Sequence, residues 1–283
     1  MNFLYELLTL MTLVKMGTVI LITVILSVVA EAVSPRIAGI LTGFPLGAAI
    51  SIFFMGFEIS PAFAAESALH TSAGISATIT FAYCYYTASV LAKGLNCTLQ
   101  IFAATIAGLL GYCAAIFLLH FVPAGFAAAS VLPVASIFLF IRLFRKIENV
   151  KIEKRVSVSP ALLLLRAFFA ACSVVLIIST AKIVGPTWAG LFAAFPNILL
   201  PLVVIIQFTY MPEHAYVIIK NVPKGLASVV TFCLTVSLTY GDYGIYLGTV
   251  LGYMTSIIYL VVIQFGRDLL LFAKKKMVPL GML

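Results

Sequence analysis

The chain has 283 residues, of which 63% are hydrophobic and only 9% are charged. A soluble domain carries about 25% charged residues, and the mean hydropathy of +1.20 fits the same contrast. These values exclude a water-soluble protein and predict an all-α polytopic membrane protein. The net charge of +8 does not indicate a nucleic-acid partner, because the basic residues lie in short loops between apolar segments.

Apolar segments long enough to cross a bilayer recur along the chain, separated by Pro, Gly and charged residues. We predict nine transmembrane helices, near residues 12 to 33, 37 to 57, 73 to 92, 98 to 121, 124 to 141, 161 to 183, 188 to 209, 224 to 240 and 244 to 266. The segments that follow Pro61 and Pro212 could extend the third and eighth helices backward.

The distribution of basic residues orients these helices. The stretch from Arg142 to Arg155 is the most basic and is expected on the cytoplasmic side. Counting helices outward from it places 14 of the 17 Lys and Arg residues on that side. We therefore expect an integral plasma-membrane protein, in the inner membrane if the source is bacterial, with its N-terminus outside and its C-terminus in the cytoplasm.

The sequence contains an internal repeat. Residues 15 to 87 align without a gap to residues 166 to 238, at an offset of 151. Six of the twelve prolines pair in this register, as Pro35 with Pro186, Pro45 with Pro196, and Pro61 with Pro212. A later match, Leu110 to Tyr112 with Leu251 to Tyr253, has an offset of 141. Apolar composition alone does not readily produce three proline pairs in one register.

The repeat unit therefore holds four helices, and the fifth helix is left as a linker. Because four plus one is odd, the second unit enters the membrane from the opposite side, which makes the units inverted repeats. We predict a first four-helix repeat over 1–122, a linker helix and basic loop over 123–158, a second repeat over 159–266, and a basic cytoplasmic tail over 267–283. A duplicated scaffold without transport is the alternative.

Both halves share the pattern A-G-x4-F-P, which begins at Ala38 in the first half and at Ala189 in the second. This pattern resembles the second helix of the small four-helix GlpM-like membrane proteins, and each half is similar to one such protein. More distantly, fused inverted four-helix units resemble the drug/metabolite transporters. The resemblance implies a membrane protein of duplicated four-helix units and no particular substrate.

Pro45 and Pro196 lie near the middle of the second and seventh predicted helices. Proline removes a backbone hydrogen bond there, so each helix is expected to break. Inverted-repeat transporters bind substrate near the membrane midplane, at broken helices. We therefore expect a substrate site between these two helices, although small residues there also suit close packing. Its candidate residues around the breaks are Thr42, Gly43, Phe44, Pro45, Phe195, Pro196 and Asn197.

Charged residues within or near the predicted helices extend this hypothesis. Lys15 aligns with Arg166, so both halves carry a cation at the same position, and both are candidate substrate-binding residues for an anionic solute. Glu31 is the candidate coupling carboxylate. The alternative is that Lys15 and Arg166 reach the membrane interface as anchors and that Glu31 has a terminal role.

The sequence as a whole favours a secondary transporter or facilitator of a small solute. A non-transporting membrane subunit that binds a partner protein is the alternative. An enzyme is not expected, because acids, histidines and pairs of nucleophile and base are missing from the middle of the helices. We expect no cofactor and no metal. The expected partners are the lipid bilayer and a small-molecule substrate, and a homodimer is left open.

Overall fold

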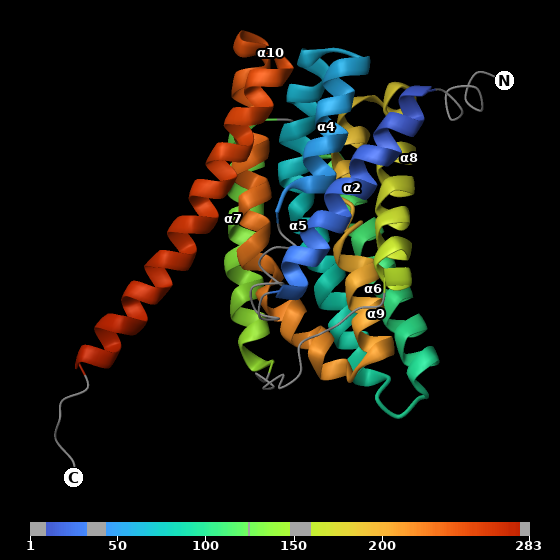
Figure 1. Cartoon of the computed structure of the whole chain (residues 1–283), viewed down its shortest axis with the longest axis vertical. Coiled ribbons are helices and arrows are strands. Elements are labelled where there is room, and N and C mark those ends of the chain that lie inside the picture. The colour runs from blue at the N-terminus through green and yellow to red at the C-terminus, as the bar shows by residue number, and fades with distance from the viewer. Residues whose placement is uncertain (1–9, 33–43, 124, 148–159, 278–283) are drawn as a thin grey trace.

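The computed structural model of the chain describes residues 10–32, 44–123, 125–147 and 160–277. These residues form eight α-helices and a short 3₁₀ helix (Phe144–Lys146), and no strand occurs among them. Figure 1 shows the helices as an elongated bundle. They are α2 (Leu10–Ala32), α4 (Leu46–Glu58), α5 (Pro61–Leu91), α6 (Cys97–His120), α7 (Phe126–Leu143), α8 (Pro160–Ala193), α9 (Leu199–Thr209) and α10 (Pro212–Met277).

Several of these helices have the length and composition of membrane spans. In the described part of the chain, four segments are long and apolar enough to cross a bilayer, namely Cys97–His120, Phe126–Leu143, Ala161–Ala193 and Pro212–Ile263. Shorter apolar helices cover Thr12–Ile22, Leu46–Glu58 and Leu199–Thr209. The all-helical structure is consistent with the predicted helical membrane protein.

Two of the longest helices each contain a sharp reversal at a glycine. Gly185 in α8 has a φ of 80° and a ψ of 171°, and Gly244 in α10 has a φ of 73° and a ψ of 173°. This backbone region is open essentially to glycine alone. Each helix is therefore two segments joined at a turn, and Figure 1 shows the second segment of α10 descending away from the bundle.

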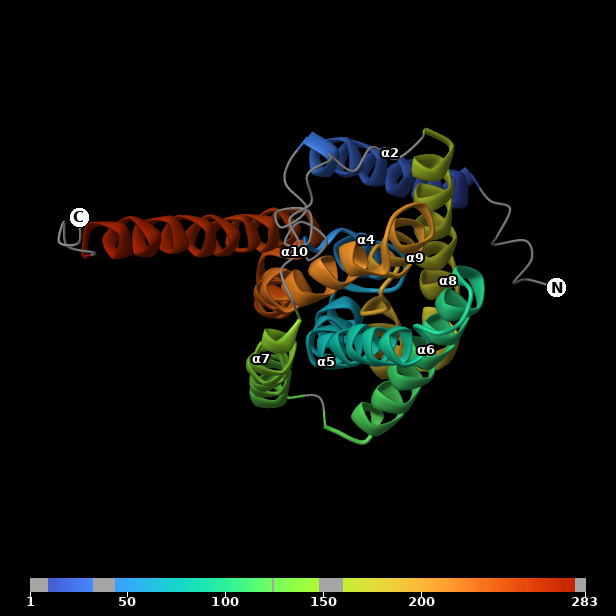
Figure 2. The same cartoon turned by 90° about the horizontal axis from the view of Figure 1, so that it is seen from below.

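Helix α5 is the centre of the bundle and begins where the sequence places a start signal. The Ser60 hydroxyl accepts a hydrogen bond from the Phe63 N–H at 3.1 Å, and Pro61 occupies the first helical position. The predicted extension of the third helix back to Pro61 is confirmed, as is that of the eighth to Pro212. Viewed from below in Figure 2, α5 lies among the other helices, and it packs on α4, α6, α7, α8 and α10.

This central position explains why α5 is less apolar than its neighbours. Sixteen of its residues are buried, and they include Ser67, Thr71, Ser72, Thr78 and Ser89. Small hydroxyl side chains let helices approach closely and donate hydrogen bonds to neighbouring helices. Because α5 faces protein on most sides, it does not need the continuous apolar surface of a helix that faces lipid.

Helices that match in the repeat register pack against each other in opposite directions. Helix α2 packs on α8, and α5 packs on α10. In Figure 1, α2 and α5 run downward, whereas the first segments of α8 and α10 run upward. This arrangement brings the two breaks, at Pro45 and Pro196, to the middle of the bundle.

The closest approach of α8 to α5 occurs at Gly190. A Cβ atom at Gly190 would overlap the backbone oxygen of Ser67 and lie 2.7 Å from the Cβ of His70. We expect Gly190→Ala to force the helices apart and to lower the free energy of unfolding by roughly 1–3 kcal/mol, the usual cost of overpacking. Thermal unfolding of the detergent-solubilised protein measures the loss.

Gly17 in α2 supplies the matched control. A Cβ there would meet no atom within 4 Å, and alanine favours a helix over glycine by up to about 1 kcal/mol. Gly17→Ala should therefore unfold at or slightly above the wild-type temperature. Equal unfolding temperatures for the two variants would contradict the assigned contact between α8 and α5.

Candidate functional site

Both prolines coincide with breaks between helical segments. Helix α8 ends at Ala193, residues 194–198 are not helical, and α9 begins at Leu199. Pro45 directly precedes the first residue of α4, Leu46. Proline cannot donate the backbone hydrogen bond that a continuous helix needs, so the chain turns at both places. In Figure 1, α4 rises from the middle of the bundle and α9 descends from it.

A small cavity of about 40 Å³ lies where these two breaks meet. A volume of that size holds only a few water molecules. Fourteen of its seventeen lining residues form seven pairs at the repeat offset of 151. The pairs are Phe44 with Phe195, Pro45 with Pro196, Leu46 with Asn197, Gly47 with Ile198, Ala48 with Leu199, Ile75 with Leu226, and Thr78 with Val229.

The structure brings together five of the residues that the sequence suggested for substrate binding. Phe44, Pro45, Phe195, Pro196 and Asn197 all line the cavity. Thr42 and Gly43 lie outside the described residues. Sequence reasoning missed four other lining residues, which come from α5 and α10: Ile75, Thr78, Leu226 and Val229. The offset of 151 that pairs the prolines also pairs these four residues. Their role in binding a solute stays a prediction.

The two predicted substrate-binding cations, Lys15 and Arg166, lie away from the cavity. Lys15 on α2 is 5% exposed and forms an ion pair with Glu58, with the Lys15 Nζ atom 2.5 Å from Glu58 Oε1. Arg166 is partly buried in the first segment of α8. Neither Lys15 nor Arg166 lines the cavity. Glu31 belongs to the last turn of α2, but its side chain lies outside the described part of the structure.

Hydroxyl groups from α5 and α6 satisfy the backbone carbonyls at the broken end of α8. The Thr71 Oγ1 atom donates to the Gly190 carbonyl at 3.0 Å, and the Tyr112 hydroxyl donates to the Leu191 carbonyl at 2.7 Å. Thr78 Oγ1 donates to the Ala194 carbonyl at 2.5 Å. The Gly190 and Leu191 carbonyls also share the Ala194 N–H at 3.3 Å. A buried carbonyl without a partner would cost several kcal/mol in an apolar environment, so the hydroxyl contacts strengthen the weakly bonded end of α8.

Aromatic contacts cross between the two halves in the same register. The Tyr112 ring meets Phe195 edge to face at 5.5 Å between centroids, and Tyr253 stacks on Phe44 at 5.7 Å. Phe44 and Phe195 pair at an offset of 151, and the two tyrosines pair at 141. Each half therefore covers the break of the other half with a tyrosine.

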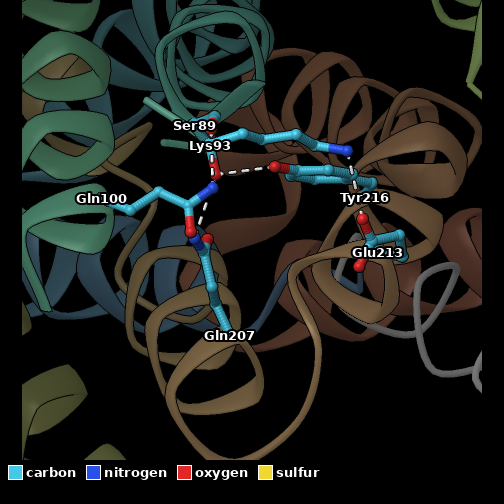
Figure 3. A network of polar contacts seen from close by, with 6 residues as sticks. All are labelled: Ser89, Lys93, Gln100, Gln207, Glu213 and Tyr216. Atoms are coloured by element: carbon cyan, nitrogen blue, oxygen red, sulfur yellow. Dashed lines mark hydrogen bonds and ion pairs between the residues drawn. The ribbon is translucent and has the colours of Figure 1, made fainter. Parts of the chain in front are cut away.

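A buried polar cluster lies where α5 and α9 end and α10 begins, and Figure 3 shows all its residues except Tyr85. Tyr85 donates to Gln207 Oε1 at 2.9 Å, and Gln207 Nε2 donates to the Ser89 hydroxyl at 3.0 Å. The Ser89 and Tyr216 hydroxyls are 2.9 Å apart, and Gln100 Nε2 donates to the Ser89 carbonyl at 2.7 Å. All five side chains are buried. We call this set of residues the polar cluster.

An exposed ion pair lies beside the polar cluster. Lys93 Nζ is 3.2 Å from Glu213 Oε1, and this hydrogen bond raises the pKa of the lysine. Figure 3 shows the pair on the far side of the Tyr216 ring from Gln207. Because Lys93 is half exposed, water screens the interaction and its contribution to stability is small.

The matching positions near the other end of the bundle have mostly apolar contacts, although the Tyr240 hydroxyl also lies 2.7 Å from that of Thr249. A Cβ at Gly56 on α4 would lie 2.7 Å from Ile245 and 3.4 Å from the Tyr240 ring. Gly56 pairs with Gln207 in the repeat register, and Ser89 and Tyr240, two residues past the aligned ranges, keep the same offset of 151. Gly56 and Gln207 each lie eight residues beyond a lining residue of the cavity, or about 12 Å along a helix. Equivalent positions in the two halves thus have surroundings of different chemistry.

A second and larger cavity lies between α2, α4 and the second segment of α10. Its volume is about 430 Å³, and its lining is mostly apolar and aromatic. Its threonine hydroxyls, on Thr18 and Thr249, already donate to the carbonyls of their own helices. Such a surface suits lipid chains better than a polar solute, so we place the candidate site in the smaller cavity.

The polar cluster should be worth more to stability than the ion pair beside it. Gln207→Leu removes the acceptor of Tyr85 and the amide that donates to Ser89, and unpaired buried groups cost about 1–3 kcal/mol. Lys93→Gln should cost at most about 1 kcal/mol, because the pair is exposed. Thermal or denaturant unfolding of the purified protein compares the two.

Tyr85→Phe combined with Gln207→Leu provides the internal control. The double variant lacks the stranded tyrosine hydroxyl, so its loss of stability should be smaller than the sum of the two single losses. Strictly additive losses would contradict a direct contact between these side chains.

Comparison with known proteins gives no relative from which a role could be carried over to this site. No family model, no curated protein and no solved structure matches the chain.

Proposed function

We propose that the chain is a secondary transporter or facilitator that moves a small solute through the cavity between the breaks at Pro45 and Pro196. The observation that carries the proposal is the lining of this cavity by seven register pairs, one member from each half. Inverted-repeat transporters place their substrate site at such an interface, formed by broken helices. A shared cavity of this kind lets either half move relative to the other around one site.

The proposal includes the finer architecture of nine spans in two inverted repeats. The reversal at Gly244 divides α10 into two crossings. The reversal at Gly185 divides α8 into one crossing and the start of a second, which α9 completes. The opposite directions of register-matched helices in Figure 1 support an inverted relation. Helix α7, with the basic residues that follow it, is then the linker between the repeats.

Access to the cavity from both sides of the membrane distinguishes transport from its alternative. Ala48 lines the cavity and is almost fully buried. We expect Ala48→Cys, in a background with the five native cysteines replaced by alanine, to react with a membrane-impermeant thiol reagent from either side of oriented vesicles. Mass spectrometry quantifies the reaction, and thermal unfolding checks that the background protein is folded.

Phe102→Cys is the matched control, because Phe102 is 63% exposed on the outer surface of α6 and should face lipid. It should react from neither side. Reaction of Ala48→Cys from one side only would overturn the proposal in favour of a non-transporting membrane subunit.

The proposed arrangement also fixes the orientation. The stretch from Arg142 to Arg155 and the tail from Lys274 to Lys276 carry many of the basic residues, so both are assigned to the cytoplasm. A reporter that is active only in the cytoplasm should be active when fused after Lys276 and inactive when fused at the N-terminus. Activity at both ends would mean an even number of spans and would remove the inverted relation between the halves.

A further inference from the structure

We infer that the cavity between the two breaks binds a small monovalent anion at the N-termini of α4 and α9. This inference rests on the proposed function, for which it names the substrate class. Three observations support the anion site: the positions of the two helix ends, one buried amide, and the bonded carbonyls of α8. The site does not depend on the cations that the sequence suggested.

Two helix N-termini meet at the cavity. Residues 44–48 at the start of α4 and residues 196–199 at the start of α9 all line it. Neither helix has a side-chain cap, since the N-cap residues are Pro45 and Ile198. Each helix N-terminus acts as about half a positive charge, because its first N–H groups lack acceptors within the helix. The Leu46 N–H already donates to the Phe44 carbonyl at 2.7 Å, the Leu200 N–H donates to the Pro196 carbonyl at 2.8 Å, and Pro201 has no N–H. The remaining first-turn donors are those of Gly47 and Ala48 on α4 and of Leu199 on α9. Together the two ends favour about one negative charge.

The third helix end at the cavity opposes only part of this field. The last turn of α8 also borders the cavity, and the carbonyls at a helix C-terminus attract cations. The Gly190 and Leu191 carbonyls already accept hydrogen bonds from Thr71 and Tyr112, and the Ala194 carbonyl just after α8 accepts one from Thr78. No Asp, Glu, Lys or Arg is among the described lining residues, so the helix termini dominate the local field.

The Asn197 amide is the independent sign of a ligand. Asn197 is 5% exposed and lines the cavity, and its Nδ2 atom has no hydrogen-bond partner. It packs directly against Gly47, where a Cβ would overlap the amide. A buried N–H donor without an acceptor costs about 1–3 kcal/mol, and an anion that accepts from it would remove that cost. Gly47 provides the space in which the amide sits at the start of α4.

The size of the cavity restricts the anion. A volume of about 40 Å³ matches a halide, nitrate or formate ion more closely than a large organic acid. Lys15 is held by Glu58 away from the cavity, so its charge is not needed for binding. The anion is thus recognised by backbone N–H groups and one amide.

Anion-dependent thermal stabilisation of the purified full-length protein tests the inference. Chloride, nitrate and formate are titrated as sodium salts against gluconate, at constant sodium concentration and ionic strength. A ligand that binds the folded state raises the unfolding temperature with concentration. We expect at least one of the small anions to stabilise the wild type, and Asn197→Ala to weaken its apparent affinity about tenfold, as loss of a charge-assisted hydrogen bond does. Asn197→Asp should abolish the effect through charge repulsion.

Asn221→Ala is the matched control. Asn221 is 6% exposed, but its amide donates within its own helix to the Val217 carbonyl at 2.8 Å and does not line the cavity. Its affinity for the anion should equal that of the wild type. Equal responses of the wild type and both Asn197 variants would show binding at the basic surface instead and would overturn the inference. Equal weakening by Asn197→Ala and Asn221→Ala would also overturn it.

The outcomes separate this inference from the proposed function. If no small anion stabilises the wild type while Ala48→Cys reacts from both sides, the inference fails and transport stands. If anion binding depends on Asn197 while Ala48→Cys reacts from one side only, the anion site stands and transport fails.

Discussion

The rest of this structure depends on satisfying backbone polar groups where two helices break inside an apolar bundle. At the break before Pro196 the carbonyls of Gly190 and Leu191 share one backbone donor, the Ala194 N–H, at 3.3 Å, and lipid offers no further donor. Thr71 and Thr78 on α5 and Tyr112 on α6 supply the further donors. This requirement accounts for the central position of α5 and for its hydroxyl-rich composition, because a polar helix in this role must be enclosed by other helices.

The repeat adds a second level of constraint. Register-matched helices pack in opposite directions (Figure 1), and each tyrosine of the pair Tyr112 and Tyr253 covers the break of the other half. The lining of the cavity is symmetric in position and asymmetric in chemistry, as Leu46 with Asn197 and Gly47 with Ile198 show. The asymmetry gives the cavity a single unpartnered amide, and the symmetry places that amide between two helix N-termini.

Sequence reasoning located the breaks and much of the cavity because both follow from local and periodic signals. A proline in an apolar segment predicts a break in the helix by itself, because it lacks the backbone N–H. A single offset of 151 pairs the residues of α4 with those of α9 without knowledge of the fold. The hydroxyl contacts could not be found in this way, since Thr78 and Ala194 are 116 residues apart and nothing in either segment specifies the other. For the same reason Lys15 was considered for the solute site, whereas its carboxylate partner Glu58 depends on how α2 packs on α4.

The different surroundings of Gly56 and Gln207, which are equivalent positions in the two halves, have a thermal consequence. Separating Gly56 from Tyr240 and Ile245 would expose apolar surface, which raises the heat capacity. Separating Gln207 from Ser89 and Tyr85 would instead expose polar groups, which lowers it. If the protein transports as proposed and the two ends open in turn, the balance between the outward-open and inward-open populations shifts with temperature.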